Sequence, residues 1–235
     1  MSEHPGAERR RPPLSSPTFA VRAPLAAWLE AQAHELHERL GPYRLLDVGC
    51  GQKPYLPFFE RYASEYVGVD VVENPFAELL GPVEALPVDD ASFDVVLCAQ
   101  VLEHCDDPAR AVSELRRVTR PGGRVLASTH GVMVYHPSPG DYWRWTHAGL
   151  ERLFRENADW SAVTVSPASG TTACLGMTIS LFIDLLAKRA RLRRPAGALV
   201  AGINRAAAGV DARVAALREL RPGALIANYH VAADA

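Results

Sequence analysis

The chain has 235 residues, 48% of them hydrophobic, and its 25 lysines and arginines nearly balance its 27 aspartates and glutamates. This length suits one domain with a sizeable core, and the net charge of −2 excludes a global positive field that recruits nucleic acid. The four cysteines are scattered without a C-x-x-C pair. They exclude a disulfide framework and a cysteine zinc site, and they predict a reducing, cytoplasmic location.

The first 18 residues predict no ordered element. Residues 1–18 are rich in proline, arginine and serine and lack the apolar core of a signal peptide. We therefore expect a disordered tail over 1–18 and a single domain over 19–235. No apolar run is predicted to reach the length of a membrane-spanning helix.

The ordered part alternates between helical and strand patterns. Leu25, Leu29 and Leu36 follow helical spacing, and Gly41-Pro42 ends that helix. Four nearly continuous apolar runs follow, "YRLLDV", "YVGVD", "FDVVLCA" and "RVLAST", with a helix predicted from 108 onward between the last two. This order predicts an α/β fold with a doubly wound, mostly parallel sheet.

The turn after the first strand, in "LLDVGCGQKPY", predicts a ligand without phosphate. Gly49 and Gly51 let the backbone approach a ligand, but Pro54 removes an amide donor that a pyrophosphate needs. Asp47 favours a cationic ligand, and Asp70, at the end of the second strand, can accept both hydroxyls of a ribose. A ribose, a positive charge and no phosphate together indicate S-adenosylmethionine, with S-adenosylhomocysteine as its product.

These segments, with "VEALPVDDASFDVVLCAQVLEH" and "ELRRVTRPGGRVLAST", resemble the class I S-adenosylmethionine-dependent methyltransferases over about residues 43–129. The resemblance implies a seven-stranded Rossmann-like sheet. It also implies that the methionine end of the cofactor lies against Asp47, Gly49, Cys50 and Gly51, the ribose against Asp70, the adenine against Val71, Val83 and Glu84, and the sulfonium over Ala99 and Gln100. Lys53 departs from the family's usual third glycine, and Pro82 stands where many members have an aspartate for the adenine amino group.

Two other interpretations of this region remain open. One is a Rossmann-like domain for NAD or a nucleotide sugar, although those ligands want more glycine amides at the pyrophosphate. The other is a methyltransferase fold that has lost its chemistry and serves as a cofactor-binding subunit of a complex.

The loop over 130–147 follows the fifth strand and is predicted to close over the methyl acceptor. Three histidines and two tryptophans fall in it, and loops at this edge carry sites. We expect His130, directly after the strand, to act as the base, with His136, Asp141 and Arg144 as its partners or as contacts for the acceptor. The alternative is a lid in which Asp141 and Arg144 form a structural pair.

The segment after the fourth strand carries a partial metal-binding pattern. Quinone-pathway O-methyltransferases have E-x-x-E-H here, whereas this chain has Gln100, Glu103 and His104. Loss of the first carboxylate weakens such a site, so we expect structural roles for Glu103 and His104 and no metal.

The sheet of this family ends in two antiparallel strands, here expected at 162–165 and 227–232. The residues between them, about 171–221, predict a helical insertion with an apolar stretch followed by basic residues such as Lys188. It can serve as a lid, as the interface of a homodimer, or as a peripheral membrane contact.

The sequence therefore predicts a methyltransferase acting on a hydroxyl of a small molecule, a sugar or glycan, or a secondary metabolite, with no nucleic-acid partner. An N-methyltransferase is the nearer alternative, because an amine acceptor needs less help from a base.

Overall fold

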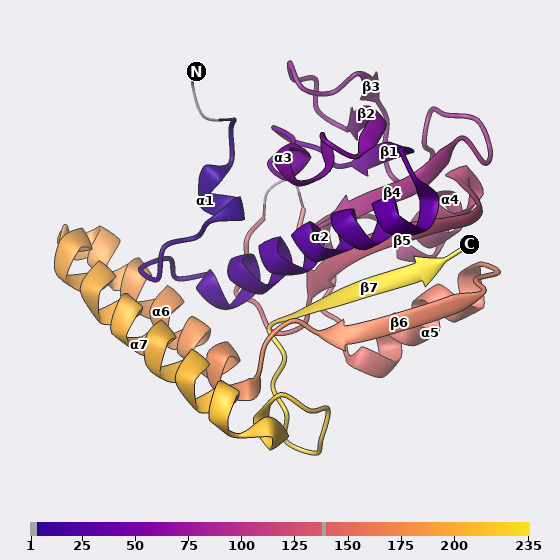
Figure 1. Ribbon diagram of the computed structural model, residues 1–235. Helices are drawn as coiled ribbons and strands as arrows, with labels where there is room; N and C mark the ends of the chain where they lie inside the picture. Colours follow the sequence, from indigo (N-terminus) through magenta and orange to yellow (C-terminus); the bar gives the residue numbers. More distant parts are fainter. Residues whose placement is uncertain (1–3, 138–139) are drawn as a thin grey trace.

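The computed structural model describes residues 4–137 and 140–235, and one seven-stranded sheet forms its centre (Figure 1). The strand order is β3-β2-β1-β4-β5-β7-β6. The strands are β1 (Tyr43–Val48), β2 (Ala63–Asp70), β3 (Leu79–Leu80), β4 (Phe93–Ala99), β5 (Thr119–His130), β6 (Ala162–Pro167) and β7 (Asn228–Asp234). Only β7 runs antiparallel to its neighbours, β5 and β6. The predicted doubly wound, mostly parallel α/β sheet is confirmed.

Helices cover both faces of this sheet (Figure 1). On one face, α2 (Phe19–Leu40) and α3 (Leu56–Phe59) pack on side chains of β1 and β4 such as Leu45 and Leu97. On the other, α4 (Pro108–Val118) and α5 (His147–Asn157) pack on the alternate side chains, such as Val96 and Val125. Because the central strands are buried on both faces, they appear in the sequence as continuous apolar runs.

Local signals explain most element boundaries. The Asp107 side chain accepts a hydrogen bond from Arg110 N at 3.0 Å, and Pro108 opens α4, as predicted. Gly41, with φ 72°, ends α2. The fifth strand begins at Thr119, five residues before the predicted start, because the register shifts between the pairs Phe93–Thr119 and Val95–Arg124 and accommodates the Pro-Gly-Gly segment.

The expectation of a disordered tail over 1–18 is wrong for residues 4–18. They include the short helix α1 (Ala7–Arg10), and Arg10 donates to the Pro54 carbonyl at 2.6 Å. Further along, Asn204 donates to the carbonyls of Leu14 and Ser16 at 2.7 and 2.9 Å. Composition alone predicted disorder here because it registers the lack of apolar residues. Hydrogen bonds from polar side chains to backbone carbonyls, rather than apolar burial, hold this segment in place.

The predicted helical insertion is present between β6 and β7. It consists of α6 (Thr171–Ala190) and α7 (Arg193–Arg213), which pack side by side away from the sheet (Figure 1). Asp211 of α7 accepts hydrogen bonds from Thr172 N and Ala173 N at the start of α6, and thereby fastens the two helices together. A 3-10 turn, Ala215–Leu217, follows α7.

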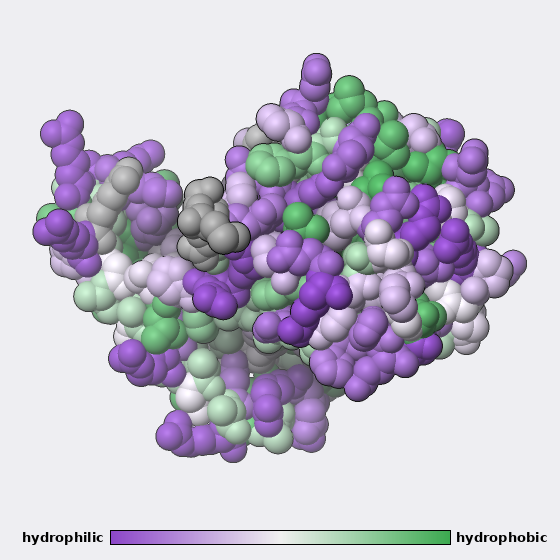
Figure 2. Space-filling view, turned by 45° about the horizontal axis from the view of Figure 1, so that its top comes forward, coloured by the Kyte–Doolittle hydropathy of each residue, from purple (hydrophilic) through white to green (hydrophobic). Residues whose placement is uncertain are grey.

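Helix α6 is more apolar than expected. Among the described residues, α6 is the one helix that is both long enough and apolar enough to cross a membrane. Its mean hydropathy is 1.4 over an 18-residue window, and 33% of that window is buried. Leu175, Ile179 and Phe182 lie exposed on it, and hydrophilic side chains gather at the projecting end of the helical pair (Figure 2). The expectation that no apolar run has this length is therefore wrong, while the lid, homodimer and membrane roles stay predictions.

His230 in β7 makes the stability of the fold depend on pH. Its imidazole stacks on Trp28 with ring centroids 4.5 Å apart, and burial lowers its pKa to about 4. Below about pH 6.5 the unfolded chain binds a proton at this residue that the folded chain does not bind until about pH 4. This histidine therefore makes the free energy of unfolding fall as the pH drops through that window.

We expect the wild type to lose about 2 kcal/mol more of its unfolding free energy between pH 7.5 and pH 5 than a His230→Phe variant. Urea unfolding at the two pH values measures the difference. A His34→Gln variant is the control, because His34 is exposed on α2. Equal losses in the wild type and His230→Phe would show that His230 does not set this dependence.

Candidate functional site

The turn after β1 forms one wall of a cleft at the carboxyl edge of the sheet. Gly49 N and Cys50 N both donate to the Val69 carbonyl, at 2.8 and 3.1 Å, which ties the turn to β2. Gly49 has φ 67°, and a Cβ there would lie 2.5 Å from Val101 Cγ2. Gly51 has φ 51° and nothing within 4 Å of such a Cβ, so its backbone is open to a ligand.

This cofactor cleft, as we call it, has a volume of about 450 Å³. Eight of the ten residues predicted to bind the cofactor line it: Gly49, Gly51, Asp70, Val71, Val83, Glu84, Ala99 and Gln100. They come from the ends of β1, β2 and β4, which are neighbours in the sheet, and from the loop at 81–84, as the topology of an open parallel sheet requires.

Asp47 and Cys50, the other two predicted residues, do not line the cleft. Asp47 is buried and accepts a hydrogen bond from the Tyr66 hydroxyl at 2.7 Å; burial raises its pKa to about 7. Burial likewise raises the pKa of the Cys50 thiol to about 12. The structure gives both side chains a supporting place below the turn and not a place in the cleft wall.

Asp70 stands at the mouth of the cleft. Its two carboxylate oxygens accept hydrogen bonds from Gly51 N at 2.8 Å and Val72 N at 3.1 Å. Each carboxylate oxygen can accept more than one hydrogen bond. The backbone therefore fixes Asp70 in one orientation and leaves it able to accept the hydroxyls of a ribose.

Lys53, which replaces the usual glycine, is buried under the turn. It has φ 49°, and its Nζ lies 2.6 and 2.7 Å from the two carboxylate oxygens of Glu78. Glu78 also accepts from Gly68 N at 2.6 Å. The turn thus tolerates the lysine in a left-handed conformation because its ammonium is paired beneath the loop rather than placed in the cleft.

A second cavity of about 390 Å³ adjoins the cofactor cleft. Both are lined by Arg9, Gln100 and His104. Gln100 follows β4 with φ 61°, and its Nε2 donates to Ser128 Oγ at 2.8 Å. Sequence reasoning missed Arg9, because the segment that carries it was expected to be disordered.

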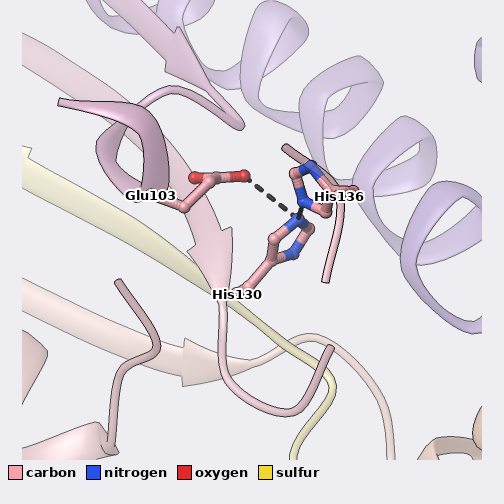
Figure 3. Close-up of side chains that lie close together, drawn as sticks. All are labelled: Glu103, His130 and His136. Atoms are coloured by element: carbon pink, nitrogen blue, oxygen red, sulfur yellow. Dashed lines mark hydrogen bonds and ion pairs between the residues drawn. The ribbon is translucent and has the colours of Figure 1, made fainter. Parts of the chain in front are cut away.

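Three side chains meet in the wall of the second cavity: Glu103, His130 and His136, the triad from here on (Figure 3). His130 Nε2 lies 3.1 Å from His136 Nε2 and 3.1 Å from Glu103 Oε1. The sequence could not predict this meeting, since Glu103 lies 27 residues before His130 and was assigned a structural role.

The electrostatics of the triad differ from those expected of a histidine base. Burial, together with the neighbouring His136 and Arg144, lowers the pKa of His130 to about 3. Burial raises the pKa of Glu103 to about 7. The imidazole of His130 is therefore neutral at pH 7 and a weaker base than an ordinary histidine, and its role as the base stays a prediction.

Asp141 and Arg144 form the structural pair that was the alternative to a catalytic role. Two guanidinium nitrogens of Arg144 lie 2.6 and 2.8 Å from the Asp141 carboxylate oxygens, and neither residue lines the cofactor cleft or the second cavity. Asp141 also accepts from His136 N at 3.0 Å, and Arg144 donates to the Val134 carbonyl at 3.0 Å. In this structure they hold the loop that carries His136, and a contact with the acceptor stays a prediction.

His104 contacts the loop over 130–147 and lines both cavities. Its Nδ1 forms a hydrogen bond with the Gly140 carbonyl, and its ring meets that of His136 edge to face, with centroids 5.1 Å apart. Residues 138 and 139 of the predicted acceptor loop lie outside the described residues.

Comparison with known proteins agrees with this architecture. Residues 46–127 match a family model described as a methyltransferase domain. A protein of Mycolicibacterium smegmatis, named as a probable S-adenosylmethionine-dependent methyltransferase, is 34% identical over 118 residues, which are 46% of this chain and 46% of that protein. The ubiquinone biosynthesis O-methyltransferase of Hahella chejuensis is 36% identical over 101 residues, 37% of this chain and 42% of that one.

Residues 46–127 form a class I S-adenosylmethionine-dependent methyltransferase domain. The fold extends this similarity over more of the chain. The crystal structure of an S-adenosylmethionine-dependent methyltransferase from Archaeoglobus fulgidus superposes with a TM-score of 0.55 at 14% identity, covering 89% of this chain and 94% of that one. The chain nonetheless spans less than half the length of the curated relatives it matches.

Proposed function

We propose that this methyltransferase domain transfers the methyl group of S-adenosylmethionine to a hydroxyl of a small-molecule, sugar or secondary-metabolite acceptor. One observation carries the proposal: the cofactor cleft and the second cavity adjoin at Gln100, and the second cavity holds the triad. A donor in one cavity and an acceptor in the other would meet at this point, as a displacement at a methyl carbon requires.

The residues of the cofactor cleft fit S-adenosylmethionine. Asp70 offers a carboxylate for the ribose, while Gly51 presents open backbone beside it. The helix after the turn, α3, has four residues with a proline in its first turn, so it offers few amides to a phosphate. When bound, the cofactor supplies an electrophilic methyl group on a sulfonium.

The rest of the chain's contribution is placement. Val71 and Val83, to which the resemblance assigns the adenine, line the cofactor cleft, as do Ala99 and Gln100, to which it assigns the sulfonium. Arg9, which lines both cavities, offers a cation to the carboxylate of the methionine or to an anionic group of the acceptor.

The triad favours a hydroxyl over an amine as the acceptor. Two imidazoles and a carboxylate offer hydrogen-bond acceptors that can orient an O–H, and the Glu103 carboxylate, whose pKa burial raises to about 7, can receive its proton. An amine can react from its neutral form without such help, so N-methylation is the second candidate. The named relatives of this chain include an O-methyltransferase, which supports a hydroxyl acceptor.

Calorimetric titration tests the cofactor part of the proposal. We expect S-adenosylmethionine and S-adenosylhomocysteine to bind one per chain and to compete with each other, because both carry the ribose that Asp70 would accept. NAD should give no heat. Binding of NAD in place of S-adenosylmethionine would instead support the dinucleotide interpretation.

A further inference from the structure

The triad has the arrangement of a metal-ligand set as well as that of a hydrogen-bonded cluster. One nitrogen or oxygen from each member, Glu103, His130 and His136, lies within 4.8 Å of the other two. The two distances from His130 Nε2 are 3.1 Å each. Ligands about 2.0–2.2 Å from a tetrahedral ion lie roughly 3.3–3.6 Å apart, so an ion fits after small movements.

An orphaned oxygen points to a missing partner at this place. Glu103 is fully buried, and its Oε2 accepts from Thr129 Oγ1 at 2.8 Å. Its Oε1 has no hydrogen-bond partner among the described residues, although it lies 3.1 Å from His130 Nε2. A buried carboxylate oxygen without a hydrogen-bond partner lowers the stability of the folded chain, and a bound cation would give it a partner.

We propose that the triad binds one divalent transition-metal ion of the zinc type through Glu103 Oε1, His130 Nε2 and His136 Nε2. Two imidazoles and one carboxylate suit such an ion, whereas magnesium and calcium prefer sets made only of oxygen. Three protein ligands leave an open position, which is the pattern of zinc sites that act on substrates. Here that position faces the second cavity, because all three residues line it.

The groups around the triad hold its members in place for this role. Thr129 donates to Glu103 Oε2, the carboxylate oxygen that is not a proposed ligand. Asp141, paired with Arg144, accepts from the backbone N–H of His136. His130 Nδ1 lies 3.3 Å from the side-chain amide of Asn228, whose Oδ1 has no hydrogen-bond partner among the described residues. Rotation of that amide gives the Nδ1–H of a metal-binding His130 the acceptor it needs, in exchange for the hydrogen bond of 3.3 Å from Asn228 Nδ2 to Gln100 Oε1.

The chemical consequence rests on the proposed function. A cation at the triad lowers the pKa of an acceptor hydroxyl placed against it, so the hydroxyl loses its proton to solvent more easily. The new O–CH₃ bond then forms as the S–CH₃ bond breaks, and the electron pair of that bond stays on sulfur in S-adenosylhomocysteine.

Zinc titration of the full chain after removal of metals with a chelator tests the site without any methyl acceptor. We expect one Zn²⁺ per chain, and a dissociation constant raised at least about tenfold in Glu103→Gln and in His136→Ala. Magnesium should give no heat. Glu103→Gln keeps an acceptor for Thr129, and His136 is only half-buried, so both variants should retain the fold, which thermal unfolding verifies.

Two matched histidine variants define the ligand set. His147→Ala removes a histidine whose Nε2 lies 3.1 Å from the Val165 carbonyl, and zinc affinity should not change. His104→Asn keeps a side-chain donor for the Gly140 carbonyl, and it should also bind zinc normally. Loss of zinc in His104→Asn as large as in His136→Ala would overturn the proposed set in favour of one that includes His104.

Cobalt substitution gives a second readout. Co²⁺ in the site should show visible absorption of a four- or five-coordinate ion without the thiolate band that binding to cysteine would add, and His136→Ala should remove this absorption. The proposal would be overturned if the wild type did not bind zinc, or if Glu103→Gln and His136→Ala bound zinc with the affinity of the wild type. Cofactor titration in parallel separates the two claims, since zinc and S-adenosylmethionine binding can each fail while the other succeeds.

Discussion

Replacement of His130 with alanine is expected to lower turnover by roughly 10²–10⁴ and to leave the affinity for S-adenosylmethionine within about twofold of the wild type. His130 is the central member of the triad, with Nε2 3.1 Å from an atom of each other member, and it lines the second cavity but not the cofactor cleft. Its loss therefore removes acceptor activation, whether direct or through a cation, and spares the cofactor.

Turnover with methyl-labelled S-adenosylmethionine and a host-cell extract, and calorimetry with the cofactor, give the two values for this variant. The control is His147→Ala, which removes a histidine of the same loop that lines neither cavity. Near-normal turnover of His130→Ala would contradict a role for the triad and would favour an amine acceptor that needs alignment alone. Urea unfolding shows whether the buried substitution leaves the fold intact.

The second large effect is expected at Asp70. Asp70→Ala removes the carboxylate at the mouth of the cofactor cleft, and a charge-assisted hydrogen bond of about 1.5–3 kcal/mol is lost, so binding of S-adenosylmethionine should weaken about ten- to hundredfold. Calorimetry measures this change.

Asp70→Asn separates ligand binding from loop support, because an asparagine oxygen can still accept from Gly51 N. We expect it to bind the cofactor with intermediate affinity. Glu73→Gln, three residues away and exposed, is the charge control and should not differ from the wild type. An unchanged affinity in Asp70→Ala would show that the ribose does not lie at this residue.

The fold could be predicted from the sequence because its signals are local. Apolar runs mark the strands, Asp107-Pro108 marks a helix start, and glycines mark the turns that need positive φ. The cleft followed from the same signals, since strand ends of a parallel sheet must meet at one edge.

The errors arose where long-range contacts decide the outcome. The segment with Arg9 is polar, yet residues far away in the sequence hold it in place. Its Arg10 side chain donates to the Pro54 carbonyl, and its Leu14 carbonyl accepts from Asn204. A long-range contact also positions Asp47, whose carboxylate accepts from the Tyr66 hydroxyl 19 residues later, while its role toward the cofactor stays a prediction. No local pattern contains that information.

The triad shows the same limit at the site itself. Crowding of histidines in the loop indicated a functional place, and His130 was singled out because it ends β5. That Glu103 would reach it, and that burial would lower the pKa of His130 to about 3, depends on how β4 and β5 lie side by side. A partial metal pattern around Glu103 was the one signal present, and its expected partner was His104 rather than His130.

We propose above that this chain moves a methyl group from S-adenosylmethionine to a small acceptor. Incubation of the purified chain with methyl-labelled S-adenosylmethionine and a host-cell extract, read by mass spectrometry, tests it most directly. We expect a labelled small-molecule product carrying the methyl group on oxygen, strongly reduced with His130→Ala and, at a cofactor concentration below the dissociation constant, reduced with Asp70→Ala. Binding of S-adenosylmethionine without transfer of label to any component of the extract would contradict it and support a non-catalytic, cofactor-binding subunit.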